Sequence, residues 1–387
     1  MSQLTVTAYN VRFGDAFLLT VPDLANGKEV TRHILIDLGS VIGGRDDEVI
    51  YRQIASDILR RLNGHPVDLY VMTHEHMDHV AGLSYLDRLG LPIPIDYAWL
   101  TASSAQGYYD RFPEAKKRLA LYESDYKRVR LAATGENQGT QLLLPLLEIN
   151  NRGSTEACVG YIKNAARTTS YVYRGFEPIA GHNHPFVETK LAIWGPEEDT
   201  AVYYGRYKPL TMTAVANATG RPLQTEPPPG VEPSGFAALM EYLASGVGDS
   251  MLAIDRAANN TSIVLAVEWR GWRLLFPGDA DLKSWAVMGN RGVLQPVHFL
   301  KAGHHLSRNG TPREDLLERI LPSARPDQRP RYCLVSTWPR NLLASERAVY
   351  QGVPDEMTRE RIAARVDKIY ETALVPPGSY IEAAFPG

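Results

Sequence analysis

The motif His74-x-His76-x-Asp78-His79 constrains this chain more than any other sequence feature. Four side chains that can bind a metal fall within six residues, directly after the short apolar run 67–72 and before a helical pattern. A loop that leaves a buried strand can turn alternate side chains inward. We therefore expect His74 and His76 to bind one ion, and Asp78 and His79 to lie at a second position a few ångströms away. The alternative is a polar surface loop, but exposed histidines have no evident reason to cluster and buried ones need partners.

Two later segments carry further candidates. Asp279 follows a Gly at the end of a predicted strand, where a carboxylate could bridge two ions, although Gly-Asp turns are common by themselves. The pair His304-His305 follows the next apolar strand, and neighbours in an extended segment face opposite ways. We predict His304 as the metal ligand, with His305 as its substitute or as a proton-handling group. Asp78 is expected to orient the attacking water, and Lys301 or His305 to steady the charge of the transition state.

Strand and helix patterns occur in both halves of the chain. The predicted strands are 4–11, 16–21, 33–37, 67–72, 262–269, 272–276, 297–301, 331–336 and 378–384. The predicted helices are 48–62, 80–89, 108–131, 236–243, 281–288, 311–320 with Thr311 as N-cap, and 359–370 with Thr358 as N-cap. This alternation predicts an α/β sandwich with two sheets inside and helices outside. Residues 132–260 alternate short segments with Gly, Asn and Pro, and 101–258 are interpreted as an insertion that carries substrate recognition.

The composition of the chain argues against several classes of protein. Apolar residues make up 44% of the 387, which is enough for a large buried core. Two cysteines, Cys158 and Cys333, cannot build a disulfide framework, which suits a reducing cytosol. The net charge of −3 argues against a chain held mainly by nucleic-acid phosphates. No apolar run approaches the ~20 residues of a membrane span and no export signal opens the chain. We therefore expect a cytoplasmic protein with no membrane partner.

The motifs, taken in order, resemble those of the metallo-β-lactamase fold superfamily. Finer features are similar to one branch, the hydrolase domain of the competence protein ComEC. The match covers about residues 4–100 and 255–340. The segments that carry it are Gly14-Asp15 before an apolar strand, Asp37-x-Gly39 after one, the first histidine motif, Asn259-Asn260-x-Ser262, Gly278-Asp279-Ala280 and Leu300–Ser307 with its two histidines.

The resemblance implies a fold, a cofactor and a reaction. The fold is a metallo-β-lactamase-like αββα four-layer sandwich, a single domain over 1–387 with 101–258 as a helical and loop insertion. The cofactor is one or two divalent ions, Zn²⁺ first and Mn²⁺ as the alternative. The implied reaction is metal-assisted hydrolysis of a phosphodiester such as a nucleic acid. The implied metal ligands are His74, His76, Asp78, His79, Asp279 and His304.

The chain also departs from the family pattern. The usual third histidine between the first motif and Asp279 has no clear counterpart, and its place is taken by Asn259 or Asn260, which could hold a water or a substrate oxygen. His182 or His184 is the alternative ligand, against a plain surface role for both. Near the C-terminus, 352–354 reads Gly-Val-Pro where the branch has Gly-His-Pro. Because no membrane spans are present, a role in DNA uptake does not carry over.

The substrate stays open at this point. Six basic residues on the predicted helix 108–131 fit a solvated helix face better than a nucleic-acid surface, because acidic residues are interspersed among them: Lys116, Lys117, Arg118, Lys127, Arg128 and Arg130. The pairs Tyr108-Tyr109 and Tyr203-Tyr204 could stack on bases or pack ordinarily. Three functions therefore remain: a nuclease or other phosphodiesterase, a hydrolase of a small ester, lactone or amide, and a non-catalytic binding protein on the same fold.

Overall fold

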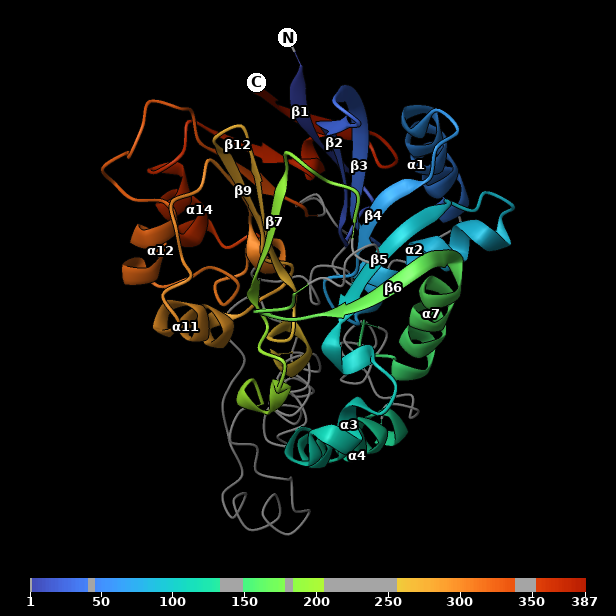
Figure 1. Ribbon diagram of the computed structural model, residues 1–387. Helices are drawn as coiled ribbons and strands as arrows, with labels where there is room; N and C mark the ends of the chain where they lie inside the picture. The colour runs from blue at the N-terminus through green and yellow to red at the C-terminus, as the bar shows by residue number, and fades with distance from the viewer. Residues whose placement is uncertain (1, 41–45, 133–148, 178–183, 205–255, 338–352) are drawn as a thin grey trace, which may run out of the picture.

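Two β-sheets form the centre of the molecule. The computed structural model describes residues 2–40, 46–132, 149–177, 184–204, 256–337 and 353–387 (Figure 1). The first sheet has the spatial order β13 (Tyr380–Pro386), β1 (Gln3–Tyr9), β2 (Ala16–Ala25), β3 (Lys28–Leu38), β4 (Val67–Val71), β5 (Ile95–Thr101) and β6 (Ala166–Val172). The second has the order β12 (Lys368–Glu371), β11 (Tyr332–Val335), β10 (Phe299–Lys301), β9 (Trp272–Phe276), β8 (Val264–Trp269) and β7 (Lys190–Gly195).

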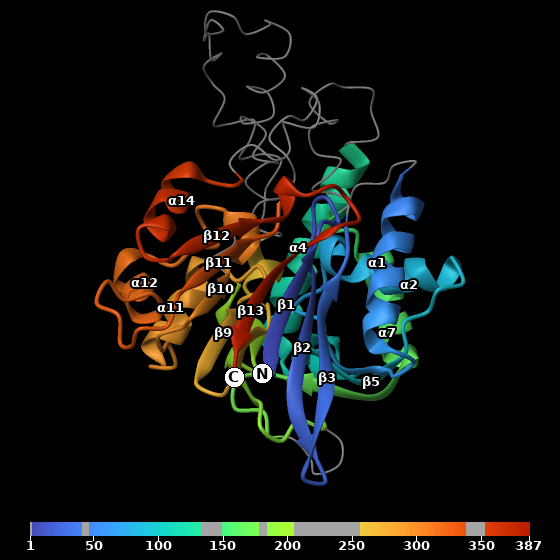
Figure 2. The ribbon, with the colours of Figure 1, turned by 90° about the horizontal axis from the view of Figure 1, so that it is seen from above.

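Helices cover the outer face of each sheet. Figure 2 shows three of them beside the first sheet, α1 (Asp47–Leu62), α2 (Met77–Arg88) and α7 (Arg152–Ala165). On the opposite side, α11 (Leu282–Asn290), α12 (Glu314–Ile320) and α14 (Glu356–Ala363) lie beside the second sheet. This arrangement confirms the predicted αββα fold class. At one end lie α3 (Tyr108–Arg111) and α4 (Pro113–Ala132) (Figure 1). The short 3-10 turns are η1 (Ala102–Ser104), η2 (Thr200–Val202), η3 (Gly303–Leu306) and η4 (Thr372–Leu374).

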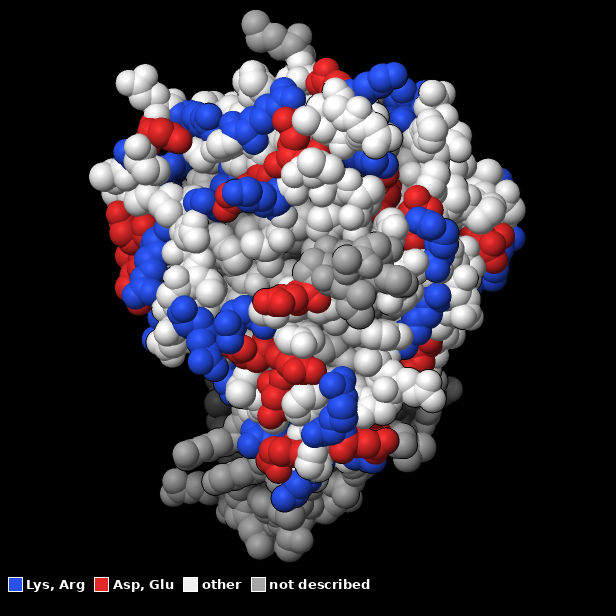
Figure 3. Space-filling view, in the orientation of Figure 1, with Lys and Arg blue, Asp and Glu red and all other residues white. Residues whose placement is uncertain are grey.

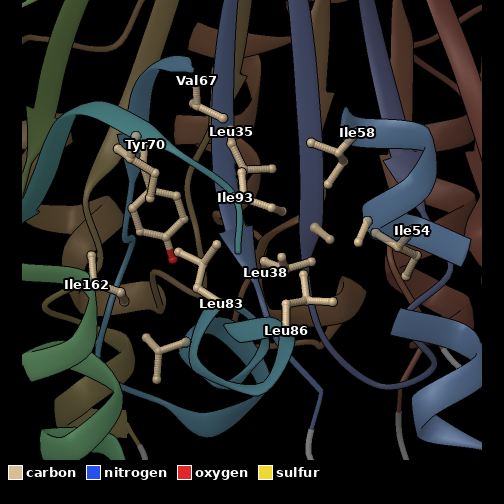
Figure 4. Packing of buried hydrophobic residues seen from close by; sticks show 14 of the residues in the cluster. Leu35, Leu38, Ile54, Ile58, Val67, Tyr70, Leu83, Leu86, Ile93 and Ile162 are labelled. Atoms are coloured by element: carbon tan, nitrogen blue, oxygen red, sulfur yellow. The ribbon is translucent and has the colours of Figure 1, made fainter. Parts of the chain in front are cut away.

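Three apolar layers hold the sandwich together. Between the first sheet and its helices, Leu35 of β3 belongs to one apolar cluster with Ile54 and Ile58 of α1 and Leu83 of α2 (Figure 4). The spacing of Ile50, Ile54 and Ile58 places them on one face of α1, which turns toward this cluster. A second cluster lies between the two sheets, and a third joins the second sheet to its helices. Burial of each Leu or Ile side chain contributes about 1.5–3 kcal/mol to the free energy of folding.

Parallel pairing brings the candidate ligands to one end of the sandwich. β4 runs parallel to β3, with Ile36 opposite Val71, and β10 runs parallel to β9, with Leu300 opposite Leu275. The carboxyl ends of parallel strands meet at one edge of a sheet, so the loops that follow them gather there. Both ends of the chain pair in the first sheet, where Gln3 lies opposite Pro386 (Figure 2). None of the described helices has the length and apolar content that crossing a bilayer requires.

Part of the segment 101–258 belongs to the sandwich. It supplies α7, β6 at the edge of the first sheet and β7 at the edge of the second. No strand was predicted there, because β6 and β7 are half-exposed edge strands without a buried apolar run. The predicted helix 236–243 falls outside the described residues.

Three predicted helices differ from those observed. The helix predicted over 108–131 is interrupted at Phe112, because Pro113 excludes the helical backbone at the preceding residue. α12 begins three residues after the predicted cap Thr311. The helix predicted over 359–370 is instead α14 followed by β12, and its cap is Asp355, whose side chain accepts from the Thr358 N–H at 2.8 Å.

Candidate metal centre

The first histidine motif occupies the loop from β4 into α2. His74 precedes the helix, and His76 is its N-cap residue with extended backbone (φ −105°, ψ 148°). Asp78 and His79 lie in the first turn of the helix. All four side chains are buried, which excludes the surface-loop alternative. Asp279 follows β9, and His304 and His305 follow β10.

Two glycines allow other strand ends to approach this loop closely. A Cβ at Gly39 would lie 2.5 Å from the backbone N of His79. A Cβ at Gly14, which has φ +150°, would lie 2.6 Å from the carbonyl oxygen of Asp78. The neighbouring Asp15 N–H donates to that carbonyl at 3.0 Å. These contacts explain why glycines stand in the Gly-Asp and Asp-x-Gly motifs.

Four of the predicted site residues converge on one point. The side chains of Asp78, His79, Asp279 and His305 each offer a ligand atom within 4.8 Å of the others. Nε2 of His79 lies 3.6 Å from Oδ2 of Asp78 and 3.4 Å from Oδ2 of Asp279. Nε2 of His305 lies 3.4 Å and 3.5 Å from the same two oxygens. Ligands about 2.1 Å from a tetrahedral ion lie roughly 3.4 Å apart, so this spacing fits a divalent ion.

The other nitrogen of each of these two histidines is occupied. Nδ1 of His79 donates to Oδ2 of Asp37 at 2.8 Å, and Nδ1 of His305 donates to the carbonyl oxygen of Ser336 at 2.9 Å. Carboxylate and carbonyl oxygens accept, so Nε2 of each ring faces the centre and offers a lone pair there once its proton is displaced by a cation. Nε2 of His79 and Oδ1 of Asp78 are buried and have no hydrogen-bond partner among the described residues. A bound cation would satisfy such atoms.

His74 and His76 form a second, smaller ligand pair. Nε2 of His74 lies 3.0 Å from Nδ1 of His76. Thr73 Oγ1 donates to Asp37 Oδ2 at 2.6 Å, so it accepts from Nδ1 of His74 at 3.1 Å. His76 Nε2 donates to Asn150 Oδ1 at 3.1 Å. At this separation the two nitrogens share a proton in a hydrogen bond, and a cation that displaced this proton would have both rings as ligands.

Burial and charge act differently on the two histidines His74 and His79. The pKa of His74 lies well below its ordinary value because of burial and the nearby His79 and His76, so His74 is neutral. Burial lowers the pKa of His79, but the carboxylates of Asp279, Asp78 and Asp37 raise it well above the usual value. The site thus attracts positive charge strongly.

Lys301 lies behind Asp279. Its Nζ lies 2.5 Å from Oδ2 of Asp15 and 3.1 Å from Oδ1 of Asp279, and donates to the Gly278 carbonyl at 3.1 Å. Burial lowers the pKa of Lys301, but the two carboxylates raise it above its ordinary value. An ammonium group has three N–H donors, and these three partners use them. Lys301 is thus placed to position Asp279, and its expected role in steadying the charge of the transition state stays a prediction.

His304 lies outside the group of four ligands. Its Nδ1 is 3.5 Å from Asp281, and its side chain is 24% exposed. The prediction assumed an extended segment, whereas His304 and His305 both adopt left-handed backbone (φ 47° and 52°). This turn removes the alternation on which the choice rested and directs His305 to the centre.

The remaining candidates have structural partners. His184 Nδ1 accepts from the Phe186 N–H at 3.2 Å, its ring packs on Trp99, and it is not in the ligand group. His182 lies outside the described residues. Asn260 donates to the Arg256 carbonyl and accepts from Ser284, while Asn259 is buried.

Several residues of the centre were not predicted as site residues. Asp15 and Asp37 were recognised only as members of motifs, and no role was predicted for Thr73, Asn150 or Ser336. The Gly-Asp and Asp-x-Gly patterns were the available signal for the two aspartates. Asn150 comes from the segment before α7, and no local pattern marks it.

A cavity of about 420 Å³ adjoins the centre. His76, Asn150 and Thr261 belong to its wall, and α3, α4 and α7 supply much of the rest. This volume is in the range of small-molecule sites.

Comparisons with known proteins add little to this picture. No protein-family model and no curated protein matches the chain. Among solved structures, it is similar to the metallo-beta-lactamase fold protein YhfI from Bacillus subtilis, with a TM-score of 0.39 and 9% identity over 98% of this chain and 99% of that one. It is also similar to a diphosphatase of the PhnP family, with a TM-score of 0.35 and 11% identity over 97% of this chain and 85% of that one.

Proposed function

We propose that this protein is a metal-dependent hydrolase. The observation that carries the proposal is the convergence of Asp78, His79, Asp279 and His305, from loops of both sheets and three chain segments, with ion-like spacing in buried surroundings. A donor set of two imidazoles and two carboxylates suits Zn²⁺ or Mn²⁺. The pair His74 and His76 would hold a second ion with fewer protein ligands.

The chain's own residues supply positioning and proton transfer. A divalent ion at such a site acts as a Lewis acid and lowers the pKa of water to about 7. Asp78 uses Oδ2 within the ligand group, and its buried Oδ1 is available to accept a proton from water or to orient it. Asp279 is held in place by Lys301, and His305 by Ser336.

Two kinds of bond are candidates for cleavage. The resemblance to the ComEC branch favours a phosphodiester. The cavity favours a small molecule with an ester, lactone or amide, because it is small and no Lys or Arg is among its described lining residues. On the described surface, Lys116 pairs with Asp110 and Arg118 with Glu114, and basic and acidic side chains are interspersed on the face in Figure 3. The side chains of Lys127, Arg128 and Arg130 lie outside those described.

A substrate panel tests the proposal. Metal-loaded protein would be assayed on bis(p-nitrophenyl)phosphate, plasmid DNA and a lactone, beside Asp279→Ala and His305→Ala. The proposal expects hydrolysis of at least one substrate that falls by about 10³-fold or more in both variants, since a whole ligand is lost. An exposed histidine variant, His65→Ala, should retain full activity. Metal binding without hydrolysis of any substrate would favour the non-catalytic binding protein.

A further inference from the structure

Asp15 is a fully buried carboxylate that follows Gly14 and directly precedes β2. Its backbone is held on both sides. The Asp15 N–H donates to the Asp78 carbonyl at 3.0 Å, and the Asp15 carbonyl accepts from the Gly39 N–H at 3.1 Å. Because Gly14 has no Cβ, the chain before Asp15 can approach the carbonyl of Asp78 this closely. Asp15 is therefore anchored to the helical turn that carries Asp78 and His79.

The two carboxylate oxygens of Asp15 contact groups of the second sheet. Oδ1 accepts from the hydroxyl of Ser336, which follows β11, and Oδ2 lies 2.5 Å from Nζ of Lys301 at the end of β10. Each of these two partners holds a metal ligand in turn. The Ser336 carbonyl accepts from Nδ1 of His305 at 2.9 Å, and Lys301 donates to Oδ1 of Asp279 at 3.1 Å. One side chain thus contacts the supports of both ligands from the second sheet.

Asp15 does not itself bond to the imidazoles of the ligand group. Its Oδ2 is 3.7 Å from Nδ1 of His79, and its Oδ1 is 3.8 Å from Nδ1 of His305. These separations are too long for hydrogen bonds, and each Nδ1 has a nearer acceptor, Asp37 or the Ser336 carbonyl. Asp15 therefore acts on the ligands through the groups that hold them.

We propose that Asp15 is a positioning residue of the metal centre. It sets the separation between the ligands that follow a strand of the first sheet, Asp78 and His79, and those that follow strands of the second, Asp279 and His305. This inference rests on the proposed function, because it concerns the same centre. Ligands from two sheets keep a fixed spacing when one buried group is bonded to both sides, and such outer partners tune the affinity for the metal.

The negative charge of Asp15 is needed for this role. Lys301 lies between Asp15 and Asp279, and the second oxygen of Asp279 belongs to the ligand group. With an amide at position 15, Asp279 would be the remaining carboxylate partner of Lys301 and would be drawn toward it, away from the ligand group. The amide oxygen could still accept from the Ser336 hydroxyl, so the support of His305 would remain. Asp15→Asn should therefore displace Asp279 more than His305.

Binding of Co²⁺ to the full chain tests this inference without requiring hydrolysis. The visible absorption of bound Co²⁺ depends on the number and geometry of its ligands, and titration against a competing chelator gives its affinity. We expect Asp15→Asn to weaken Co²⁺ binding by about 10–100-fold and to change the intensity and position of the absorption bands. Ser336→Ala, which removes the hydroxyl contact and keeps the carbonyl, should weaken Co²⁺ binding several-fold. On a substrate that the wild type hydrolyses, kcat of Asp15→Asn should fall while KM changes little.

Asp68→Asn is the matched control. Asp68 is a buried carboxylate near the start of β4, whereas the ligand loop follows the end of that strand. Like Asp15, it pairs with a basic side chain: its Oδ1 accepts from Arg32 Nη1 at 2.8 Å, and its Oδ2 accepts from the His33 N–H at 2.8 Å. Its replacement should lower thermal stability and leave the affinity and the spectrum of Co²⁺ at their wild-type values.

A Co²⁺ affinity and spectrum of Asp15→Asn equal to those of the wild type would overturn the inference. Equal changes in Asp15→Asn and Asp68→Asn would also overturn it, since they would indicate a general loss of stability. Circular dichroism verifies that each variant is folded; if Asp15→Asn is not, unchanged Co²⁺ affinity in Ser336→Ala overturns the inference. Failure of the hydrolase proposal is visible separately. The expected Co²⁺ changes in a protein that hydrolyses no substrate of the panel would leave the positioning role and remove the enzyme.

Discussion

At the scale of single residues, the metal centre depends on which ring nitrogen each histidine presents. One carboxylate, Asp37, controls two of them: it accepts from His79 directly and from Thr73, whose hydroxyl contacts His74. Asp37 thus joins the group of four ligands to the His74–His76 pair. Its backbone is left-handed (φ 52°), a conformation that Asp and Asn tolerate better than most residues.

Replacing Asp37 by Asn tests this role without changing the backbone preference. We expect Asp37→Asn to weaken metal binding by about 10–100-fold, because the amide orients the imidazole less firmly and lowers its basicity. Titration with a competing chelator measures the affinity. Asp23→Asn, a buried carboxylate of β2 that accepts from the Val187 and Glu188 backbones, is the control and should keep wild-type affinity. Equal metal affinity in Asp37→Asn and wild type would contradict the assigned role.

Lys301 is the second residue whose role can be tested alone. Lys301→Met leaves Asp15 and Asp279 facing each other without a cation, and we expect it to lower the free energy of unfolding by about 3–5 kcal/mol. Urea unfolding measures this change. The double variant with Asp15→Asn should recover part of the loss, since one of the two charges is removed. Wild-type stability in Lys301→Met together with a selective fall in kcat would instead place Lys301 at the reacting atoms.

Sequence alone predicted the ligand types better than their orientation. His74, His76, Asp78, His79 and Asp279 could be proposed because several metal-binding side chains followed buried strands. The choice between adjacent histidines at 304–305 needed backbone angles, which no local pattern showed. Asn150 reaches His76 across 74 positions of sequence, and such a contact depends on tertiary packing alone.

At the scale of elements, the first turn of α2 must fit against two other strand ends. Gly39 permits this contact between β3 and α2. We expect Gly39→Ala to displace that turn and to lower both stability and metal affinity, because the added Cβ would overlap backbone atoms. Gly160→Ala, inside α7 with no atom within 4 Å, should instead raise stability by about 0.5–1 kcal/mol. Thermal unfolding measures the stability of the two variants, and chelator titration measures their metal affinity. A stability and a metal affinity of Gly39→Ala equal to those of the wild type would contradict the close packing.

Helix α1 is attached to the first sheet by a polar contact as well as by its apolar face. Asp57 accepts from the Tyr9 hydroxyl at 2.8 Å and from Arg61 Nε at 2.6 Å, and Arg61 donates to Glu382 of β13 at 2.8 Å. Burial raises the pKa of Asp57, but hydrogen bonds from Arg60, Arg61 and Tyr9 hold it below its ordinary value. The attachment therefore joins α1 to β1 and β13, the strands at which the chain begins and ends.

A lowered folded-state pKa gives this attachment a definite pH dependence. Its contribution is present above the unfolded pKa of about 3.9 and is lost as pH falls through the folded value. We expect Asp57→Asn to cost about 1–2 kcal/mol at pH 6 and much less near pH 2. Urea unfolding at both pH values measures the difference. An equal loss of unfolding free energy at pH 6 and pH 2 would contradict this pH dependence. Asp110→Asn, which removes one partner of an exposed ion pair, is the control and should change the free energy of unfolding little at either pH.

At the scale of the whole molecule, the site exists only because two sheets from distant parts of the chain pack face to face. Phe17 of β2 and Phe276 of β9 meet in the layer between them, with ring centroids 6.0 Å apart. The sequence predicted this sandwich from its buried strands, whose apolar runs are visible locally. Edge strands β6 and β7 were missed because their residues are half-exposed and their assignment depends on the neighbours they pair with.

The central claim is that Asp78, His79, Asp279 and His305 together bind a divalent ion. Metal content after loading and desalting tests it most directly, measured by elemental analysis on wild type and on the adjacent variants His304→Ala and His305→Ala. The account predicts one tightly held ion per chain in wild type and in His304→Ala, and loss of that ion in His305→Ala. Metal retained by His305→Ala but lost by His304→Ala, or no bound ion in any of the three proteins, would contradict it.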